Sequence, residues 1–286
     1  MAEIKAEKMA TRQAYGKTLV ELGKTTPNLV VMDADLSKST MTAEFGKAYP
    51  ERFFNMGIAE QNLYGTACGL ALSGKVVCAS TFAMFAAGRA FEIIRNSIGY
   101  PHLNVKVVGS HGGLSVGEDG ATHQCVEDIA LMRAIPNMTV ICPADGIETS
   151  KAVQACVDTP GPVYIRIGRG FEPPCYESDN YTYEIGKAIT MREGTDLTII
   201  CCGIAVLQAM NAARVLAETD GLSVRVVNMH TIKPIDREAI LKAVTDTRRI
   251  LTIEEHNVIG GLGDAVGSVI AESGKGCVFK KHGLQD

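Results

Sequence analysis

The sequence predicts an α/β fold made of two doubly wound domains, the first with a mainly parallel sheet. Short, β-branched apolar runs alternate with helical patterns, one polar stretch with two prolines interrupts the alternation, and the alternation then resumes. Strands buried on both faces read as nearly continuous apolar runs, and their alternation with helices is typical of parallel sheets. We therefore predict a first domain over residues 1–172, a linker over 173–184 and a second domain over 185–286.

The first domain is expected to contain five buried strands and five helices. Its apolar runs, such as "NVKVVGS" at 104–110, are short and rich in β-branched residues, which favours strands over helices. The strands are predicted over residues 28–35, 75–81, 104–110, 138–144 and 163–168, and the helices over 9–26, 59–74, 89–99, 125–136 and 146–159.

The second domain repeats the pattern on a smaller scale. Strands are predicted over 196–203, 223–230 and 248–256, and helices over 204–221, 236–247 and 260–274. The "GGLG" at 260–263 lacks the lysine of a P-loop and half of a dinucleotide fingerprint, so we interpret it as a tight strand-to-helix turn. Glu254, Glu255 and His256 precede it and are interpreted as polar residues of the surface or of a subunit interface. No catalytic residue is predicted in this domain.

The composition narrows the class of protein. A net charge of −4, with 46% apolar and 21% charged residues, is ordinary for a soluble globular chain and argues against general nucleic-acid binding. No apolar run reaches the roughly 18 residues that cross a bilayer, and residues 1–13 lack the apolar core of a signal peptide, so we expect a cytoplasmic protein. The nine cysteines are scattered and are expected to be small buried hydrophobes rather than metal ligands. Cys125, two residues after His123, is the one with a polar neighbour of interest.

A functional site is expected at the carboxyl edge of the first sheet. In open parallel sheets, ligands bind beyond the carboxyl ends of the strands. The loops that follow the predicted strands are dense in Asp, Ser, His, Gly and Arg: "DADLSKST", "STFAMF", "SHGGLSVGEDGATHQ", "PADG" and "IGRG". Their concentration at one edge indicates a site.

The glycine-rich loop 110–124 carries His111, Glu118, Asp119 and His123. Glycines let the backbone approach a ligand closely, and two imidazoles around an acid can bind hydroxyls or phosphate and move protons. The residues alone leave two other interpretations open, an Ω-loop with incidental polar residues and a metal site.

Three further features belong to this edge. Phe82 and Phe85 are expected on one face of a starting helix, either as core packing or as a platform for a planar ring. Glu60 is the one carboxylate in "FFNMGIAEQN" at 53–62, whose apolar residues predict a buried or partly buried turn. A phosphate group could be held jointly by residues near strand and helix ends: Arg12, Lys38, Ser39 and Arg169.

Together these motifs resemble the C-terminal half of transketolase. The resemblance covers roughly residues 5–286, and "GEDGATHQ" is its most specific part. It also rests on "DADLS", "FFNMGIAEQN", "STFAMF", "CPADGIE", "VYIRIGRG" and "IEEHNVIGGLG". It implies a thiamine-diphosphate pyrimidine-binding domain followed by a transketolase-type C-terminal domain. The implied reaction is transfer of a two-carbon ketol unit from a ketose phosphate to an aldose phosphate, as in the pentose phosphate pathway.

The resemblance assigns Glu60 to the carboxylate that hydrogen-bonds a ring nitrogen of the cofactor's aminopyrimidine. Burial disfavours the charged form of a carboxyl group, which suits such a group to sharing a proton. A third aromatic residue of the family falls at Gly88, so this part of the pocket wall is altered or filled from elsewhere. The remaining matches lie around the cofactor: Phe82 and Phe85 at the aminopyrimidine, and Asp35 and Leu36 near the thiazolium.

The resemblance also assigns substrate and catalytic roles. His111 and His123 match histidines of the substrate loop, and Asp119 matches the acid that reads the configuration of the sugar's C2 hydroxyl. Four residues match the family's grip on the acceptor phosphate: Arg12, Ser39, His111 and Arg169. Their joint presence favours sugar phosphates as substrates.

The diphosphate-binding half of the family's cofactor site is missing from this chain. That half holds the diphosphate through Mg²⁺ with a "GDG"-type motif, whereas "EDG" at 118–120 belongs to the substrate loop. The resemblance therefore implies a split transketolase whose separate N-terminal-half subunit holds Mg²⁺, in an α2β2 heterotetramer.

Other members of the thiamine-diphosphate enzymes stay open as alternatives. The enzyme 1-deoxyxylulose-5-phosphate synthase shares the cofactor and the glutamate but normally has an Asp-Arg pair where this chain has Ser110 and His111. The β subunit of 2-oxoacid dehydrogenases shares the architecture but lacks "GEDGATHQ". A split transketolase specialised for a branched or sulfonated sugar is also compatible. A non-enzymatic homologue is disfavoured by the presence of Glu60, His111 and Asp119.

Overall fold

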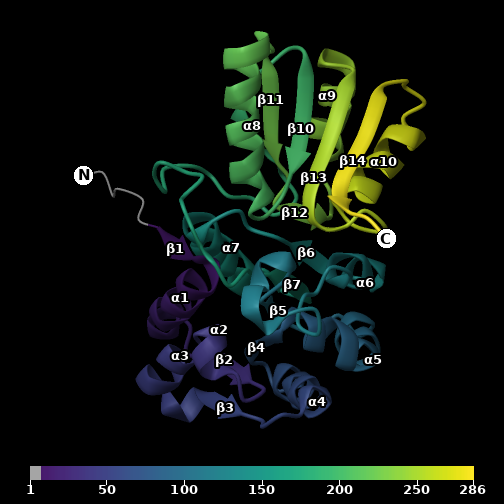
Figure 1. Ribbon diagram of the computed structural model, residues 1–286. Helices are drawn as coiled ribbons and strands as arrows, with labels where there is room; N and C mark the ends of the chain where they lie inside the picture. Colours follow the sequence, from purple (N-terminus) through teal and green to yellow (C-terminus); the bar gives the residue numbers. More distant parts are fainter. Residues whose placement is uncertain (1–7) are drawn as a thin grey trace.

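The computed structural model describes residues 8–286, except the side chain of Glu172. Each half of the chain forms a sheet flanked by helices, and Figure 1 shows the second half standing above the first. The predicted α/β fold with two mostly parallel sheets is confirmed. Within residues 8–286, no helix is both long and apolar enough to cross a membrane.

The first sheet has seven strands in the order β12–β6–β7–β5–β4–β2–β3. Six of them run parallel, whereas β12 is antiparallel to β6 and comes from the second half of the chain. All five predicted strands are present. The other two have only three residues each, too few to show an apolar period. The bounds are Leu29–Asp33 (β2), Phe53–Asn55 (β3), Val76–Phe82 (β4), Val105–Ser110 (β5), Thr139–Ile141 (β6), Val163–Arg166 (β7) and Thr231–Lys233 (β12).

Helices cover both faces of this sheet. Successive residues of β2 point to opposite faces, so Val31 packs with one group of helices, and Val30 and Met32 pack with the other. The first group is α1 (Thr11–Thr25), α3 (Ala43–Ala48) and α7 (Gly146–Asp158). The second is α4 (Glu60–Leu72), the π-helical turns η2 (Phe85–Arg89) and η3 (Ile94–Gly99), α5 (Phe91–Ile93) and α6 (Asp128–Ala134).

Short elements complete the first half. A two-stranded antiparallel ribbon joins β1 (Met9–Ala10) to β8 (Phe171–Glu172). Residues 173–184, the predicted linker, contain no helix or strand. The remaining short helical turns lie in loops: α2 (Ser37–Thr40), η1 (Pro50–Arg52) and η4 (Leu114–Asp119).

The second sheet has five strands in the order β14–β13–β10–β11–β9, with β9 antiparallel to the rest. The three predicted strands and three predicted helices are present. The two outer strands, β9 (Ile189–Arg192) and β14 (Val278–Leu284), were not predicted because they are only partly buried and lack a continuous apolar run. The other elements are Leu197–Cys201 (β10), Val224–Asn228 (β11), Arg249–Asn257 (β13), Ala205–Asp220 (α8), Arg237–Asp246 (α9) and Leu262–Glu272 (α10).

Local sequence fixes several helix ends. Asp145 and Asp236 cap α7 and α9, since each carboxylate accepts a hydrogen bond from the backbone N–H three residues later. The helix α8 ends at Gly221, which adopts the left-handed conformation that glycine tolerates best.

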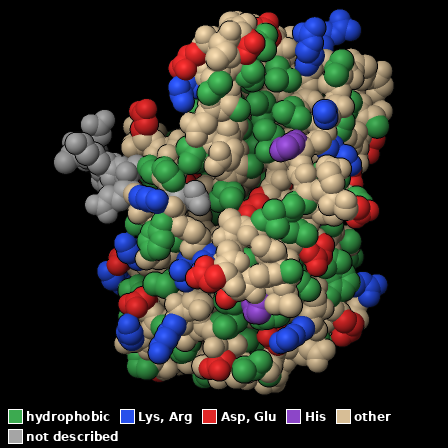
Figure 2. Space-filling model, viewed as in Figure 1, with side chains coloured by type: hydrophobic (Ala, Val, Ile, Leu, Met, Phe, Trp, Pro, Cys, Tyr) green, Lys and Arg blue, Asp and Glu red, His purple; other side chains and the backbone are tan. Residues whose placement is uncertain are grey.

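One hydrophobic core continues from the first half of the chain into the second. Met132 and Cys142 belong to the same buried cluster as Val227, Met229 and Leu262. The two halves are therefore packed against each other, although the division at 172 and 185 stays a prediction. On the face that Figure 2 shows, basic and acidic side chains are interspersed over both halves, without a field of one sign.

The nine cysteines all lie within residues 8–286, where they form no disulfide and most of them are buried. Their predicted role as small buried hydrophobes is confirmed for the buried ones. Burial raises the pKa of the Cys125 thiol, so this cysteine stays protonated and is not activated by its polar neighbour.

Candidate functional site

The loops at the carboxyl ends of the parallel strands of the first sheet form one connected edge. Loops after β2, β4, β5, β6 and β7 leave the sheet on the same side, because these strands run in one direction. Polar and ring contacts join four of these loops, those after β2, β4, β5 and β7, either directly or through α1. The predicted site residues lie on this edge or on the helices α1 and α4 beside it.

Glu60 is the first residue of α4, and its side chain is 5% exposed. The predicted burial is confirmed, but the predicted apolar setting is wrong. Nη1 of Arg89 lies 3.3 and 3.4 Å from the two carboxylate oxygens of Glu60. The preceding segment is also less buried than predicted, since Phe54 and Ile58 are 42% and 77% exposed in this single chain. A buried acid with a cationic partner thus follows an exposed apolar segment.

Phe82 and Phe85 form a stacked pair, with ring centroids 5.9 Å apart and planes inclined by 17°. The prediction that both lie on one helix face is wrong, because Phe82 is the last residue of β4 and Phe85 is the first residue of η2. The chain turns from strand into helix between them, and this turn brings the rings together. The Arg89 guanidinium lies 4.4 Å from the Phe85 centroid. Arg89 therefore links the aromatic pair to Glu60.

The loop after β2 is held by Asp33, a buried residue that the sequence interpretation did not single out. Its carboxylate accepts hydrogen bonds from three donors: the N–H of Leu36 at 2.6 Å and the hydroxyls of Thr40 and Thr42 at 2.6 and 2.9 Å. Asp35 has a φ of 64° and exchanges two hydrogen bonds with the Asn55 side chain. Asp35 and Leu36 are thereby fixed at the edge.

His111 is buried against the aromatic pair. Its ring stacks on Phe82 at 4.0 Å between centroids, and its Nδ1 lies 2.7 Å from the Ser110 hydroxyl. Burial lowers the pKa of His111 to about 3, and the positive charges of Arg12 and Arg169 add to the effect. The imidazole is therefore neutral near pH 7, and it can exchange hydrogen bonds but adds no positive charge.

The four predicted phosphate-binding residues come together around Arg12. Its Nε donates to the backbone carbonyl of Arg169 at 3.1 Å, and its Nη1 donates to the backbone carbonyl of Ser39 at 2.8 Å. Burial and the charge of Arg169 lower the pKa of Arg12. Two guanidinium groups next to a neutral imidazole form a positively charged corner of the edge. Phosphate oxygens are a suitable ligand for such a corner.

The guanidinium of Arg169 is occupied by Glu118. Two N–H groups donate to the two carboxylate oxygens at 2.5 and 2.6 Å, and these hydrogen bonds lower the pKa of Glu118 to about 2. Arg169 also donates to the backbone carbonyl of Val116 at 2.8 Å. Asp119, the acid predicted to contact substrate, is exposed beside this pair. Glu118 was noted in the motif, but nothing in the spacing indicated that it would be the ion-pair partner.

His123 completes the contacts with the aromatic pair. Its ring lies edge-on to Phe85 and Phe82, at 5.4 and 6.0 Å between centroids. Gly88, where a third aromatic residue is expected in the family, is exposed, and a Cβ there would contact only the tip of Met84. The position of the family's third aromatic residue therefore carries no side chain and is exposed in this chain. In the described part of the chain, no group of three His, Cys, Asp or Glu residues is placed to hold a metal ion.

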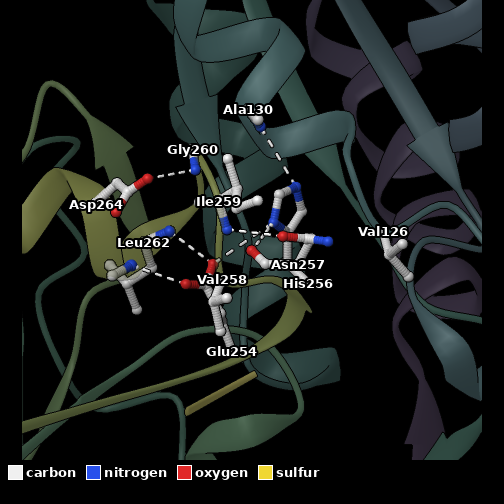
Figure 3. Close-up of polar contacts among 12 residues, drawn as sticks. Val126, Ala130, Glu254, His256, Asn257, Val258, Ile259, Gly260, Leu262 and Asp264 are labelled. Atoms are coloured by element: carbon white, nitrogen blue, oxygen red, sulfur yellow. Dashed lines mark hydrogen bonds and ion pairs between the residues drawn. The ribbon is translucent and has the colours of Figure 1, made fainter. Parts of the chain in front are cut away.

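The interpretation of "IEEHN" as surface polarity is wrong for Glu254 and His256, which are 4% and 0% exposed. Figure 3 shows the Glu254 carboxylate at the start of α10, where it accepts from the N–H groups of Leu262 and Gly263 at 2.6 and 2.8 Å. His256 Nε2 accepts from the N–H of Ala130 in α6. The predicted turn at 260–263 is confirmed, and Glu254 stabilises the helix that follows it.

A buried ion pair lies behind the glycine-rich loop and was also not predicted. Arg166, the last residue of β7, donates through Nε to Asp128 at 2.8 Å, and the two side chains are 5% and 0% exposed. Tyr164 donates to the same carboxylate oxygen at 2.7 Å. The available signal was an arginine inside the otherwise apolar run "VYIRIG", since a buried arginine requires an acidic partner.

Two family models match this chain. The model "Transketolase, pyrimidine binding domain" matches residues 7–172, and "Transketolase, C-terminal domain" matches residues 186–281. Together they cover both sheets.

Individual relatives agree with these models. The chain is 52% identical to the "Putative transketolase C-terminal section" of Methanocaldococcus jannaschii, over 96% of this chain and 86% of that protein. It is 41% identical to a subunit of the apulose-4-phosphate transketolase of Phocaeicola vulgatus, over 93% and 85%. Against the human "Transketolase" the identity is 38%, over 94% of this chain but 43% of that protein. A solved "Split gene transketolase, inactive beta4 tetramer" matches with a TM-score of 0.91 at 52% identity, over 98% and 91%. This chain therefore belongs to the transketolase family.

Proposed function

We propose that this chain is the C-terminal-half subunit of a split transketolase, which transfers a two-carbon ketol unit from a ketose phosphate to an aldose phosphate. The observation that carries the proposal is the contact cluster at the carboxyl edge of the first sheet. Buried Glu60 is linked through Arg89 to a stacked aromatic pair, and both histidines of the glycine-rich loop contact that pair.

Thiamine diphosphate, which transketolases generally use, fits the residues at this edge. The edge offers a buried carboxylate for a polar ring atom, two aromatic side chains for a planar ring, and an open side at Gly88. We assign Glu60 to holding a proton at a ring nitrogen of the aminopyrimidine. When bound, the cofactor supplies the electron sink for the reaction. The other residues assigned to the cofactor are Phe82, Phe85, Asp35 and Leu36.

The charged corner around Arg12 is assigned to the substrate phosphate. Arg12 and Arg169 supply charge and paired N–H donors, and the neutral His111 and Ser39 supply hydrogen bonds. A phosphate at Arg169 would replace the Glu118 carboxylate, which is bound there in this structure. The catalytic and orienting contacts to the sugar are assigned to the glycine-rich loop: His111 and His123 for proton exchange with substrate oxygens, and Asp119 for the C2 hydroxyl.

We assign Mg²⁺ and the diphosphate to a separate N-terminal-half subunit in an α2β2 assembly. Support comes from the matched family models, which are those of the pyrimidine-binding and C-terminal domains, and from the 43% of human transketolase that the chain spans. The solved split-gene relative, an inactive β4 tetramer, is consistent with a missing partner. A role in the pentose phosphate pathway is proposed on the same family basis.

The substitution Glu60→Gln, in complex with an N-terminal-half subunit, tests the proposal. Glutamine keeps the size of the side chain but cannot exchange a proton as a carboxyl group does. We expect kcat to fall by at least about 100-fold, with an unchanged circular dichroism spectrum. Glu92→Gln is the matched control, because Glu92 is a nearby carboxylate whose partner is Asn96. Near-wild-type turnover of Glu60→Gln at saturating cofactor would contradict the assignment.

The need for a partner subunit is tested with the isolated chain. We expect it to be inactive and to bind thiamine diphosphate poorly in isothermal titration calorimetry, with or without Mg²⁺. Tight, Mg²⁺-dependent binding to the isolated chain would rule out the split cofactor site.

A second candidate is a split transketolase for a different sugar. It is favoured by the 41% identity to an apulose-4-phosphate transketolase subunit and the 38% identity to a 6-deoxy-6-sulfo-D-fructose transketolase subunit. Assays of the reconstituted complex separate the candidates. One assay uses xylulose 5-phosphate with ribose 5-phosphate, and the others use apulose 4-phosphate or 6-deoxy-6-sulfo-D-fructose as the donor. Pyruvate with glyceraldehyde 3-phosphate tests the 1-deoxyxylulose-5-phosphate synthase alternative in the same series.

A further inference from the structure

Glu255 of the second domain reaches the glycine-rich loop of the first. Neighbouring side chains of a strand point to opposite faces, and Glu254 and His256 on either side of Glu255 are buried against α10 and α6 (Figure 3). Glu255 has different partners. Its Oε1 accepts a hydrogen bond from the backbone N–H of Ser115 at 2.5 Å, across 140 residues of sequence.

The loop is shaped around this carboxylate. Gly113 has a φ of 92°, and a Cβ there would lie 2.3 Å from the carboxyl carbon of Glu255. A side chain at Gly113 would strain the backbone and would displace the Glu255 carboxylate from its place. The N–H of Gly113 donates to the carbonyl of Cys125 at 2.8 Å, which ties the start of the loop to its end.

Glu255 is itself held in place from the first domain. Arg166 donates to its backbone carbonyl at 2.9 Å, and Arg166 is fixed by its buried ion pair with Asp128. Two residues further along β13, the N–H of Asn257 donates to the carbonyl of Val126 at 2.8 Å. The end of β13 is therefore bonded to the first domain at the backbone of Glu255 and again two residues beyond it.

Arg169 of the first domain also holds this stretch of loop. Arg169 donates to the carbonyl of Val116 and to the carboxylate of Glu118, three residues or fewer from Ser115. Residues 113–119 are thus fixed between a carboxylate of the second domain and a guanidinium of the first. Deleting the Glu255 contact removes the hydrogen bond from the second domain and leaves this stretch held by Arg169 and by the end of its own loop.

We propose that Glu255 is a positioning residue of the site: it holds the glycine-rich loop so that Asp119 and the two histidines keep their places at the substrate. The second domain then contributes to the site through a residue that acts on the loop and is not itself assigned to the substrate. The role of the loop in substrate binding rests on the proposed function. The hydrogen bond between Glu255 and Ser115 does not depend on that function. The two can therefore fail separately.

Hydrogen–deuterium exchange of the full-length chain, without a partner subunit, tests the contact. In Glu255→Ala, we expect the amides of residues 113–119 to exchange about 10- to 100-fold faster, because a hydrogen bond to a charged acceptor is lost. Glu255→Gln should lie between Glu255→Ala and the wild type, since the amide oxygen can still accept. Glu218→Ala is the matched control, because it removes an exposed carboxylate of α8 that is paired with Arg214. Unchanged exchange in both Glu255 variants would overturn the proposal.

Ser115→Pro removes the donor from the other side of the contact. Proline is tolerated in the first turn of a helix, where Ser115 lies. If loss of the Ser115–Glu255 hydrogen bond causes the faster exchange, the loop amides of the double variant Ser115→Pro/Glu255→Ala should exchange no faster than those of the faster single variant. If the increases in exchange rate from the two substitutions add up in the double variant, the two residues act independently, and the proposal is overturned.

Kinetics of the reconstituted complex test the positioning role. Glu255→Ala should raise KM for the aldose phosphate about tenfold while kcat changes less than about threefold, and Glu255→Gln should restore most of the loss. Faster loop exchange with unchanged KM would overturn the positioning role. If the wild-type complex is itself inactive, the proposed function fails while the exchange result still decides the Glu255 contact.

Discussion

The two sheets share one architecture but differ at their carboxyl edges. At the first sheet, the part of the edge after β4 and β5 is open and carries exposed polar residues such as Glu118, Asp119 and Arg89. At the second sheet, the ends of β10, β11 and β13 face the first domain (Figure 1), and hydrogen bonds join them to it. The bonds run from the N–H of Gly203 to Cys142, from the Asn228 side chain to Glu148 and from the N–H of Asn257 to Val126.

The difference shows that a place at the carboxyl edge does not by itself make a site. Where the closed edge meets the end of the first sheet at β6, polar groups are satisfied within the protein: Glu148 of α7 accepts from Asn228 of β11 and from Tyr176, and burial raises its pKa to about 7. At the open edge, burial and cationic neighbours lower the pKa of His111 to about 3. A buried carboxylate thus serves cohesion where the two sheets meet, whereas the imidazole of the first edge is buried beside two guanidinium groups.

The largest effect on stability is expected where the two edges meet, at the buried pair of Asp128 and Arg166. Asp128→Asn removes the negative charge and leaves the guanidinium buried without its counter-ion. Removing one partner of a buried ion pair typically costs about 3–5 kcal/mol, and we expect a loss of this size in the free energy of unfolding. Urea unfolding of the isolated chain, followed by circular dichroism, measures it.

The control for this substitution is Glu218→Gln, which removes a carboxylate paired with Arg214 where both side chains are about 60% exposed. Exposed pairs contribute little to stability, so its unfolding midpoint should match that of the wild type. Equal losses of unfolding free energy in Asp128→Asn and Glu218→Gln would show that the buried ion pair where the two edges meet stabilises the fold no more than an exposed pair does.

The sequence was sufficient to predict the central strands of both sheets, because a strand covered on both faces requires a continuous apolar run, but not the short buried strand β12. It was not sufficient for features that depend on distant partners. The alternation in "IEEHN" reads as exposed polarity, and only the contact with α6 and α10 buries His256 and Glu254. The stacking of Phe82 on His111 likewise depends on two neighbouring strands ending together. The loops of the candidate site were found because their residue types are unusual, whereas their contacts required the fold.

A smaller effect, dependent on pH, is expected at His111. Its pKa is about 3 in the folded chain, below the ordinary value of 6.5. The unfolded chain therefore takes up a proton that the folded chain does not. The stability that the neutral His111 contributes is complete above pH 6.5 and is lost as the pH falls from 6.5 towards 3. At pH 5 the loss should be about 2 kcal/mol relative to pH 7.5.

His111→Asn isolates this contribution. Asparagine does not titrate and tolerates the left-handed backbone angle of 60° found here. The difference in unfolding free energy between wild type and variant should shrink as the pH falls from 7.5 to 5, while groups such as Glu148 titrate equally in both proteins. A difference independent of pH would show that His111 titrates normally and that the open edge does not depress it.

The smallest effect on stability, with a clear effect on binding, is expected at Arg169. Its ion pair with Glu118 is solvent-exposed, since the Glu118 side chain is 77% exposed. Arg169→Lys keeps the charge but loses the paired N–H geometry that suits carboxylate and phosphate. We expect the unfolding midpoint to stay at the wild-type value, while KM for an aldose phosphate rises about tenfold in the reconstituted complex. The kcat/KM for the unphosphorylated aldose should not change, so the preference for the phosphate falls by the same factor. A drop in stability with an unchanged preference for the phosphorylated aldose would instead show that Arg169 stabilises the fold, as the residues of the closed edge do. The distinction between the two edges would then not hold at this residue.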